Sequence, residues 1–164
     1  LSPNRQPEEA SIEIQEDQRG ISFEKLFLPY IKGANHIVLY DPYIRMTYQI
    51  YNFMSFCEIL EPGSDGLHLK LVTGHDVRFE AELKGKLEEL KSGLKKENIE
   101  FVYSIDPNLH DRWIDTDTGW KIILGRGLDI FQKPDSQFSL GFLDQTKRKC
   151  KATRITYTKT WKVE

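Results

Sequence analysis

The sequence has few of the residues that build metal centres and disulfide scaffolds. Only two of its 164 residues are cysteines, and Cys57 and Cys150 lie far apart, without the spacing of metal ligands. The four histidines are scattered as well, so no zinc site is expected. Because nothing at the start resembles a secretory signal, we expect both cysteines to be free thiols.

Long apolar runs and a strong net charge are also missing. No apolar run approaches the ~20 residues of a membrane span. The formal net charge of −2 argues against a surface that is basic on all sides and covered by nucleic acid, but it leaves room for a local basic face. Hydrophobic residues make up 39% and charged residues 29%, as in an ordinary soluble domain. Because residue 1 is Leu rather than Met, we expect a piece of a longer protein.

The first twenty residues differ in composition from the rest. Residues 1–20 carry Pro, Glu, Gln, Asp and Arg and almost no large apolar side chains, which predicts a flexible linker or tail. A loosely attached surface strand around residues 11–14 is the weaker alternative. Residues 21–164 are then predicted to form one domain.

The first part of this domain alternates between helix and strand patterns. Helices are predicted over residues 23–33, 46–60 and 77–96, and strands over residues 36–40, 67–73 and 99–104. This order predicts an α/β fold with neighbouring parallel strands. The helix over residues 46–60 is apolar nearly all round, so it is expected to be buried on more than one side or to meet a partner.

The last third of the chain changes to β patterns. Residues 110–115, a turn at 117–119 and residues 120–124 predict a β-hairpin. A short strand is predicted over residues 138–142. Alternating side chains from Cys150 to Val163 predict a long final strand. The predicted fold is therefore α/β, a mixed sheet flanked by helices, with a C-terminal β-hairpin and a long final strand.

The hairpin carries the strongest candidate for chemistry. His110, Arg112 and Asp117 have nearly the spacing that a phosphodiesterase uses to attack phosphorus. On a strand, His110 and Arg112 would face the same way, one to attack and one to hold the equatorial oxygens. Asp117 would have to fold back to orient the imidazole, but Asp117-Thr-Gly119 is a natural hairpin turn, and that interpretation is favoured. We identify no second His-x-Lys/Arg pair, so the second histidine that protonates a leaving group would have to come from a twofold partner.

Several stretches resemble the C-terminal domain of the MIT-domain-containing protein 1 family. They are Gly20–Phe27, Asp41–Arg45, Tyr51–Glu58, His110–Arg112, Gly119–Phe131 and Phe138–Phe142. The same domain type resembles the C-terminal region of Lon-like ATPases in bacterial BREX phage-defence systems, and residues 116–121 look nearer to that branch.

The resemblance implies a phospholipase D-like fold without recognised lipase activity. It implies a homodimer that binds acidic phosphoinositide membranes in ESCRT-linked cytokinesis, cytoplasmic and peripheral to the membrane, with ESCRT components bound only through a separate N-terminal domain. No cofactor is expected. Arg112 replaces the usual lysine, and no Gly-Ser/Asn pattern follows Asp117, so holding a phosphate is favoured over cleaving it. Two alternatives stay open: a BREX ATPase module that contacts DNA or a partner protein, and a dimeric phosphodiesterase or nuclease.

If the domain holds phosphate groups, its ligands should be cationic and clustered. The candidates are Arg45, His110, Arg112, Lys121, Arg126 and Lys133, with Asp41 behind them as an anchor. Gly125-Arg-Gly127 would present backbone N–H groups as an anion nest, or it is an ordinary glycine turn. Arg45 has two alternatives, pairing with Asp41 or capping the helix at Met46. The run at residues 147–151 reads as a solvated loop; facing an anionic membrane, each cation there would add ~1 kcal/mol.

Overall fold

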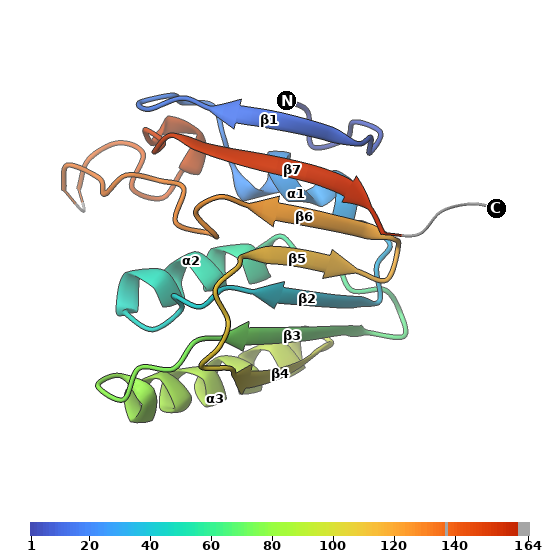
Figure 1. Cartoon of the computed structure of the whole chain (residues 1–164), viewed down its shortest axis with the longest axis vertical. Helices are drawn as coiled ribbons and strands as arrows, with labels where there is room; N and C mark the ends of the chain where they lie inside the picture. Colours follow the sequence, from blue (N-terminus) through green and yellow to red (C-terminus); the bar gives the residue numbers. More distant parts are fainter. Residues whose placement is uncertain (137, 161–164) are drawn as a thin grey trace.

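In a computed structural model, which describes residues 1–136 and 138–160, the chain forms one seven-stranded sheet with helices on one face (Figure 1). The elements are β1 (Ala10–Ile14), α1 (Phe23–Ile31), β2 (His36–Tyr40), α2 (Thr47–Glu58), β3 (Leu67–Thr73), α3 (Glu80–Lys96), β4 (Ile99–Ile105), β5 (Trp113–Thr116), β6 (Trp120–Leu124), a 3-10 turn (Gln145–Lys147) and β7 (Thr153–Lys159). The strand order is β1-β7-β6-β5-β2-β3-β4. Strands β2, β3 and β4 are parallel and the other pairs antiparallel. The α/β prediction with neighbouring parallel strands is confirmed.

The helices begin and end where local sequence signals place them. Ser22 caps α1 by accepting a hydrogen bond from the backbone N–H of Lys25 at 3.1 Å. Gly33, with a φ of +81°, follows the helix in a conformation that other residues rarely adopt. In α3, apolar residues at spacings of three and four form one stripe, of which Leu83, Leu87 and Leu94 are buried. Capping and stripe spacing therefore fix these helices locally.

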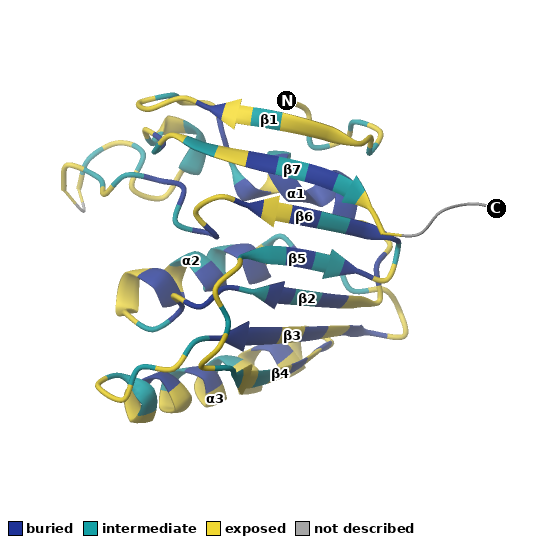
Figure 2. Ribbon diagram, in the orientation of Figure 1, coloured by how far each residue is buried: buried dark blue, intermediate teal, exposed yellow. Residues whose placement is uncertain are grey.

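A hydrophobic core lies between the sheet and the three helices (Figure 2). Alternate strand residues point into it, among them Ile37 and Leu39 of β2 and Phe101 of β4. Phe101 contacts Phe53 of α2, with ring centroids 5.5 Å apart. Helix α2 buries one side only and leaves Met46, Tyr48 and Tyr51 between 43% and 61% exposed. Among the described residues, no helix is both long and apolar enough to cross a bilayer.

The opposite face of the sheet is covered by no helix within the described part of the chain (Figure 1). Tyr40 of β2 and Trp113 of β5 stack on it with ring centroids 4.0 Å apart. The Lys121 ammonium lies 5.0 Å from the Trp113 ring centroid. This open face therefore holds an aromatic pair flanked by a cation.

The expectation of a flexible tail over residues 1–20 does not hold for Ala10–Ile14. These residues form β1, which pairs antiparallel with β7. Ile14 is 2% exposed, and Tyr30 donates a hydrogen bond to the carbonyl oxygen of Glu8 at 2.9 Å. An edge strand needs apolar residues on one side only. A mostly polar segment can therefore form one, and composition alone did not predict this strand. The weaker alternative, a surface strand over residues 11–14, matches the structure.

Three predictions for the last third are wrong in their bounds or type. The first hairpin strand begins at Trp113, so His110 and Arg112 precede it rather than lie on it. Residues 138–142 form turns instead of a strand. The final strand is Thr153–Lys159, shorter than the predicted Cys150–Val163, and Trp161 and Val163 lie outside the described residues.

Candidate functional site

Three chain segments meet at one end of the sheet and enclose a cavity. Asp41 follows the end of β2, Arg112 precedes β5, and residues 125–128 follow β6, all on the left in Figure 1. Ends of parallel strands are where sites assemble in α/β sheets. The cavity has a volume of about 210 Å³ and is lined by Asp41, Tyr43, Ile44, Gln49, Asn52, Arg112, Arg126, Leu128 and Asp129.

Asp41 is the buried carboxylate at the base of this cavity. It is 3% exposed and accepts hydrogen bonds from the backbone N–H groups of Tyr43 at 3.0 Å and Leu128 at 3.3 Å. Burial raises the pKa of Asp41 above its usual range, against the opposing effects of these two N–H donors and the Arg112 charge. Asp41 therefore lies beside Arg112, the residue that it was predicted to anchor. Burial favours the protonated form of the Asp41 carboxyl.

The turn after β6 depends on a glycine. Gly127 has a φ of +63°, and a Cβ built there would overlap Asp41 Oδ2 and come 3.0 Å from Arg112 Cδ. The glycine-turn interpretation of Gly125-Arg-Gly127 fits, because the N–H groups of Gly125 and Gly127 donate to the backbone carbonyls of Arg154 and Leu124 and are not left for an anion. The N–H of Leu128, which follows the turn, donates to the carboxyl of Asp41.

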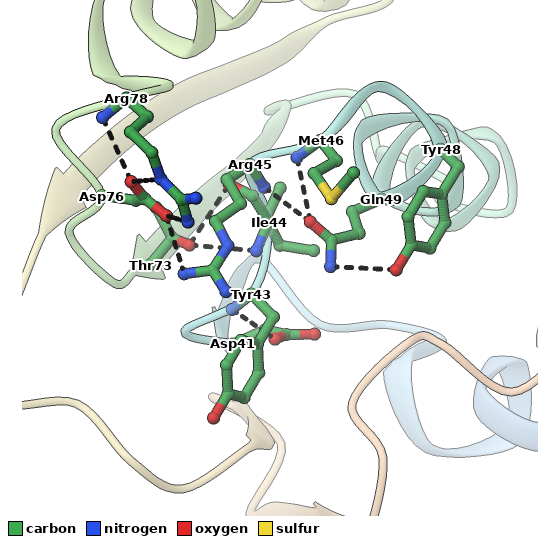
Figure 3. Close-up of polar contacts among 10 residues, drawn as sticks. All are labelled: Asp41, Tyr43, Ile44, Arg45, Met46, Tyr48, Gln49, Thr73, Asp76 and Arg78. Carbon is green, nitrogen blue, oxygen red and sulfur yellow. Dashed lines mark hydrogen bonds and ion pairs between the residues drawn. The ribbon is translucent and has the colours of Figure 1, made fainter.

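Two arginines converge on Tyr43. The guanidinium carbon of Arg112 lies 4.9 Å from the Tyr43 ring centroid, and that of Arg45 lies 5.2 Å from it. Arg45 also pairs with Asp76, Nη1 to Oδ2 at 3.4 Å, and Asp76 binds Arg78 as well (Figure 3). Neither alternative for Arg45, pairing with Asp41 or capping the helix, is found. Instead, Gln49 accepts hydrogen bonds from the backbone N–H groups of Arg45 and Met46.

The guanidinium of Arg112 keeps its hydrogen-bond donors free of carboxylates in the described residues. Within the described residues, the Arg112 guanidinium lies against the Tyr43 ring and forms no ion pair. Arg126 uses Nε to reach the carbonyl oxygen of Asp129 at 3.3 Å. The second lining carboxylate, Asp129, is bound by Lys151 at 2.8 Å. Both acids therefore have partners of their own, and the two arginines retain donors for an incoming anion.

The other predicted cations lie outside this cavity. His110 is exposed and does not line it. Lys121 lies over Trp113 on the open face of the sheet, and Lys133 lines a different cavity. The predicted cluster is therefore reduced to Arg112 and Arg126 at the cavity, with Arg45 joined to them through Tyr43.

Asp117 lies at the opposite end of the sheet from Arg112 and does not orient His110. Its Oδ1 accepts a hydrogen bond from the Asn35 backbone N–H at 3.0 Å, and Oδ2 is 3.4 Å from Nδ1 of His36. Strand β5 separates the two positions by four residues at ~3.3 Å each. Only the turn-forming interpretation of Asp117 fits this geometry.

Asp117→Ala is expected to lower the free energy of unfolding by about 1 kcal/mol, because it leaves the Asn35 N–H without its acceptor. Urea unfolding of the variant would measure this. Anion binding at the Arg112 cavity should stay unchanged. A loss of binding with no loss of stability would contradict the structural role assigned to Asp117.

The interpretation that the chain has no second His-x-Lys/Arg pair is wrong, because His68-Leu-Lys70 is such a pair. His68 and Lys70 lie on β3 and face the open side of the sheet. His68 stacks on His36 with ring centroids 4.6 Å apart, and its Nδ1 is 3.2 Å from Glu100. This pair begins at the sheet end where Asp117 lies, so it does not complete a two-histidine site with His110.

Sequence reasoning also missed several side chains of the cavity. Tyr43, Asn52 and Asp129 lie within the stretches that carry the family resemblance, but nothing in those stretches marked them as ligands, and Gln49 lies outside them. Position after a strand end pointed to Asp41 but to none of these four. Among the described residues, no group of three or more His, Cys, Asp or Glu side chains is placed to hold a metal ion.

A family model and a curated relative both match this chain over most of its length. The family model described as the phospholipase D-like domain at the C-terminus of MIT matches residues 20–159. MIT domain-containing protein 1 of Mus musculus is 38% identical over 148 residues, which cover 88% of this chain and 59% of that protein. The chain thus spans less than two thirds of this curated relative. Among solved structures, phosphatidylserine synthase of Haemophilus influenzae Rd KW20 matches with a TM-score of 0.45 and 8% identity, over 91% of this chain and 34% of that one.

Proposed function

We propose that this chain, which belongs to the family of phospholipase D-like domains at the C-terminus of MIT, holds the phosphate groups of acidic phospholipids without cleaving them. The observation that carries the proposal is the cavity in which Arg112 and Arg126 keep free donors while Asp41 and Asp129 are bound by other groups. A phosphate accepts bidentate hydrogen bonds from guanidinium groups, and two converging arginines match a phosphoinositide headgroup.

The placement of the histidines supports holding over cleavage. Attack on phosphorus needs an imidazole beside the phosphate and a second acid for the leaving group. No histidine lines the Arg112 cavity among the described residues, and Asp117 lies too far away to orient His110. Only a partner subunit would supply the missing groups. We therefore propose a binding module rather than an esterase.

The proposal includes a homodimer at the membrane surface. Two copies that face one bilayer double the number of cations, and avidity strengthens individually weak contacts. Helix α2 offers Met46, Tyr48 and Tyr51 as exposed apolar side chains for such contact. We place this module in an ESCRT-linked membrane-remodelling protein, with ESCRT components bound by a separate domain of that protein.

The test is binding to phosphatidylcholine vesicles that contain a phosphoinositide, measured by co-sedimentation. Arg112→Gln is expected to weaken binding by about 2 kcal/mol, or roughly thirty-fold in Kd, because a charge-assisted hydrogen-bond donor is lost. Arg126→Gln should act in the same direction. Lys91→Gln on exposed α3 removes the same charge away from the cavity and is the matched control. Binding by wild type should fade as salt is raised.

Two outcomes would contradict the proposal. One is equal loss of binding in Arg112→Gln and Lys91→Gln, which would reduce the effect to net charge. The other is turnover of a generic phosphodiester by wild-type protein that His110→Ala abolishes with the fold intact. That result would assign the domain to the phosphodiesterases.

A further inference from the structure

Four large apolar side chains project into solvent from one short loop. Within residues 138–143, called the apolar loop below, Phe138 is 89% exposed, Leu140 92%, Phe142 44% and Leu143 94%. Exposed leucines are ordinary when scattered, but a contiguous group of large apolar side chains marks a surface that meets a partner. The loop extends beyond the sheet at the left of Figure 1, at the same end as the Arg112 cavity.

Backbone turns hold the apolar loop in this projecting form. The N–H of Phe142 donates to the carbonyl oxygen of Ser139, and the N–H of Asp144 donates to that of Gly141. Gly141 has a φ of +95°, and its Cα lies against Lys147, where a Cβ would come 3.0 Å from the lysine Cβ. The loop is therefore anchored through its glycine, while Leu140 and Leu143 on either side remain outside.

A cationic cavity lies at the base of the apolar loop. It has a volume of about 140 Å³, and its lining includes Leu140 and Gly141 together with Arg19, Lys133, Lys147, Arg148 and Lys149. Within the described part of the chain, Asp135 is the one acidic residue of this lining. Arg148 donates to the carbonyl oxygen of Gln132 at 2.8 Å, and burial lowers the pKa of its guanidinium. A bound anion would offset this cost of burial.

We infer that the apolar loop inserts into the acyl region of an anionic bilayer while the cations at its base hold lipid phosphates. Apolar tips flanked by cations match the layered chemistry of such a surface, with headgroups above acyl chains. The loop lies at the same end of the sheet as the strand ends of β2, β5 and β6 that carry the Arg112 cavity (Figure 1), so we place the membrane at this end. This inference rests on the proposed function, and it adds a second contact that anchors the domain through hydrocarbon.

The experiment places an environment-sensitive probe on the loop of the full chain. Leu140→Cys is labelled with nitrobenzoxadiazole; both native cysteines are buried, and burial raises the pKa of the Cys150 thiol to about 11, so labelling is selective. Vesicles with phosphatidylserine and a phosphoinositide should raise the emission several-fold. A probe at Glu97→Cys, exposed beyond α3 at the other end of the sheet, should stay unchanged. A soluble inositol phosphate should leave both probes unchanged, because it brings no acyl chains.

The double variant Leu140→Ser with Leu143→Ser tests the contribution to binding. Both side chains are more than 90% exposed, so stability should be retained, while affinity for the vesicles should fall about tenfold or more. Val102→Ser, which removes a 46% exposed apolar side chain from the middle of β4 and away from this end of the sheet, is the control and should bind as wild type does.

The outcomes separate this inference from the proposed function. If wild-type protein binds anionic vesicles but the probe at position 140 and the double variant show no change, loop insertion is wrong and phosphate binding stands. If wild-type protein binds no vesicles, both are wrong. If the double variant abolishes self-association without vesicles present, the apolar loop is a subunit contact and the inference is overturned.

Discussion

Gly127→Ala is expected to lower the free energy of unfolding by about 3 kcal/mol and the Tm by roughly 10 °C. Two causes add. An alanine at a φ of +63° costs ~1–2 kcal/mol relative to glycine. Its Cβ would also overlap Asp41 Oδ2, which has to move away from its N–H donors to make room. Chemical and thermal unfolding of the variant would measure both quantities.

Two further glycines separate these causes. Gly33 has a φ of +81°, but a methyl group added there would meet nothing within 4 Å, so Gly33→Ala carries the conformational cost alone. Gly85 has an ordinary helical backbone in α3 and open space around it. Gly85→Ala should therefore be neutral or stabilising by up to ~1 kcal/mol. If Gly127→Ala lowers the free energy of unfolding by no more than Gly33→Ala does, the contact of the added methyl group with Asp41 does not destabilise the fold.

The Gly127 contact also bears on binding, because it positions Arg112 as well as Asp41. The added Cβ would also come 3.0 Å from Arg112 Cδ, so the arginine side chain has to shift as well. The cavity would then lose an arginine placed for an anion. We expect weaker vesicle binding in Gly127→Ala even below its melting temperature, and unchanged binding in Gly85→Ala.

The elements predicted well are those whose pattern is local. Strands β2 and β3 are short runs in which buried core residues alternate with more exposed ones, and α3 carries its leucines at spacings of three and four within seventeen residues. The failures depend on partners far away in the sequence. Residues 138–142 alternate as a strand does, yet β1 already covers the outer edge of β7, and Gly141 turns the chain. Residues 10–14 form a strand because β7, more than 130 positions later, offers them an edge.

The candidate site was predictable to the same extent. Asp41 could be found because it ends a buried strand, and Arg112 because it belongs to the motif. The turn-forming role of Asp117 could be favoured from Asp-Thr-Gly, but the spacing of five residues does not show that β5 runs between Arg112 and Asp117, which rules out the catalytic alternative. Arg45 and Arg112 contact the same tyrosine ring because the fold brings them together. No sequence pattern around either arginine predicts this contact.

Asp41→Ala is expected to destabilise the fold by about 2 kcal/mol. The variant leaves the Tyr43 and Leu128 N–H groups without their acceptor, and the second of these is buried. Removal of a buried carboxylate offsets part of that loss, since burial disfavours its charged form. Asp41→Asn should be milder, because its remaining oxygen still accepts from one of the two N–H groups.

The pH dependence of Asp41→Asn gives the sharper result. Burial raises the pKa of Asp41 in the folded state above the 3.8 of an unperturbed carboxyl, so the folded chain holds this proton more tightly than the unfolded chain. The stability linked to that proton is fully present below pH 3.8 and is lost as pH rises through the folded pKa. Asparagine does not titrate. The stability deficit of the variant relative to wild type should therefore shrink as pH rises from about 4 toward neutrality.

Urea unfolding of both proteins across this pH range isolates the Asp41 contribution, because their other titrating groups are the same. A deficit that grows with pH would mean that the backbone donors and Arg112 outweigh burial, and that the carboxylate is charged throughout.

The direction of the Asp41 pKa shift also matters for binding. A protonated Asp41 leaves Arg112 without a neighbouring negative charge, so the cavity gains affinity for phosphate as pH falls. Vesicle binding by wild type should then strengthen as pH falls through the raised pKa of Asp41, and binding by Asp41→Asn should lack that component.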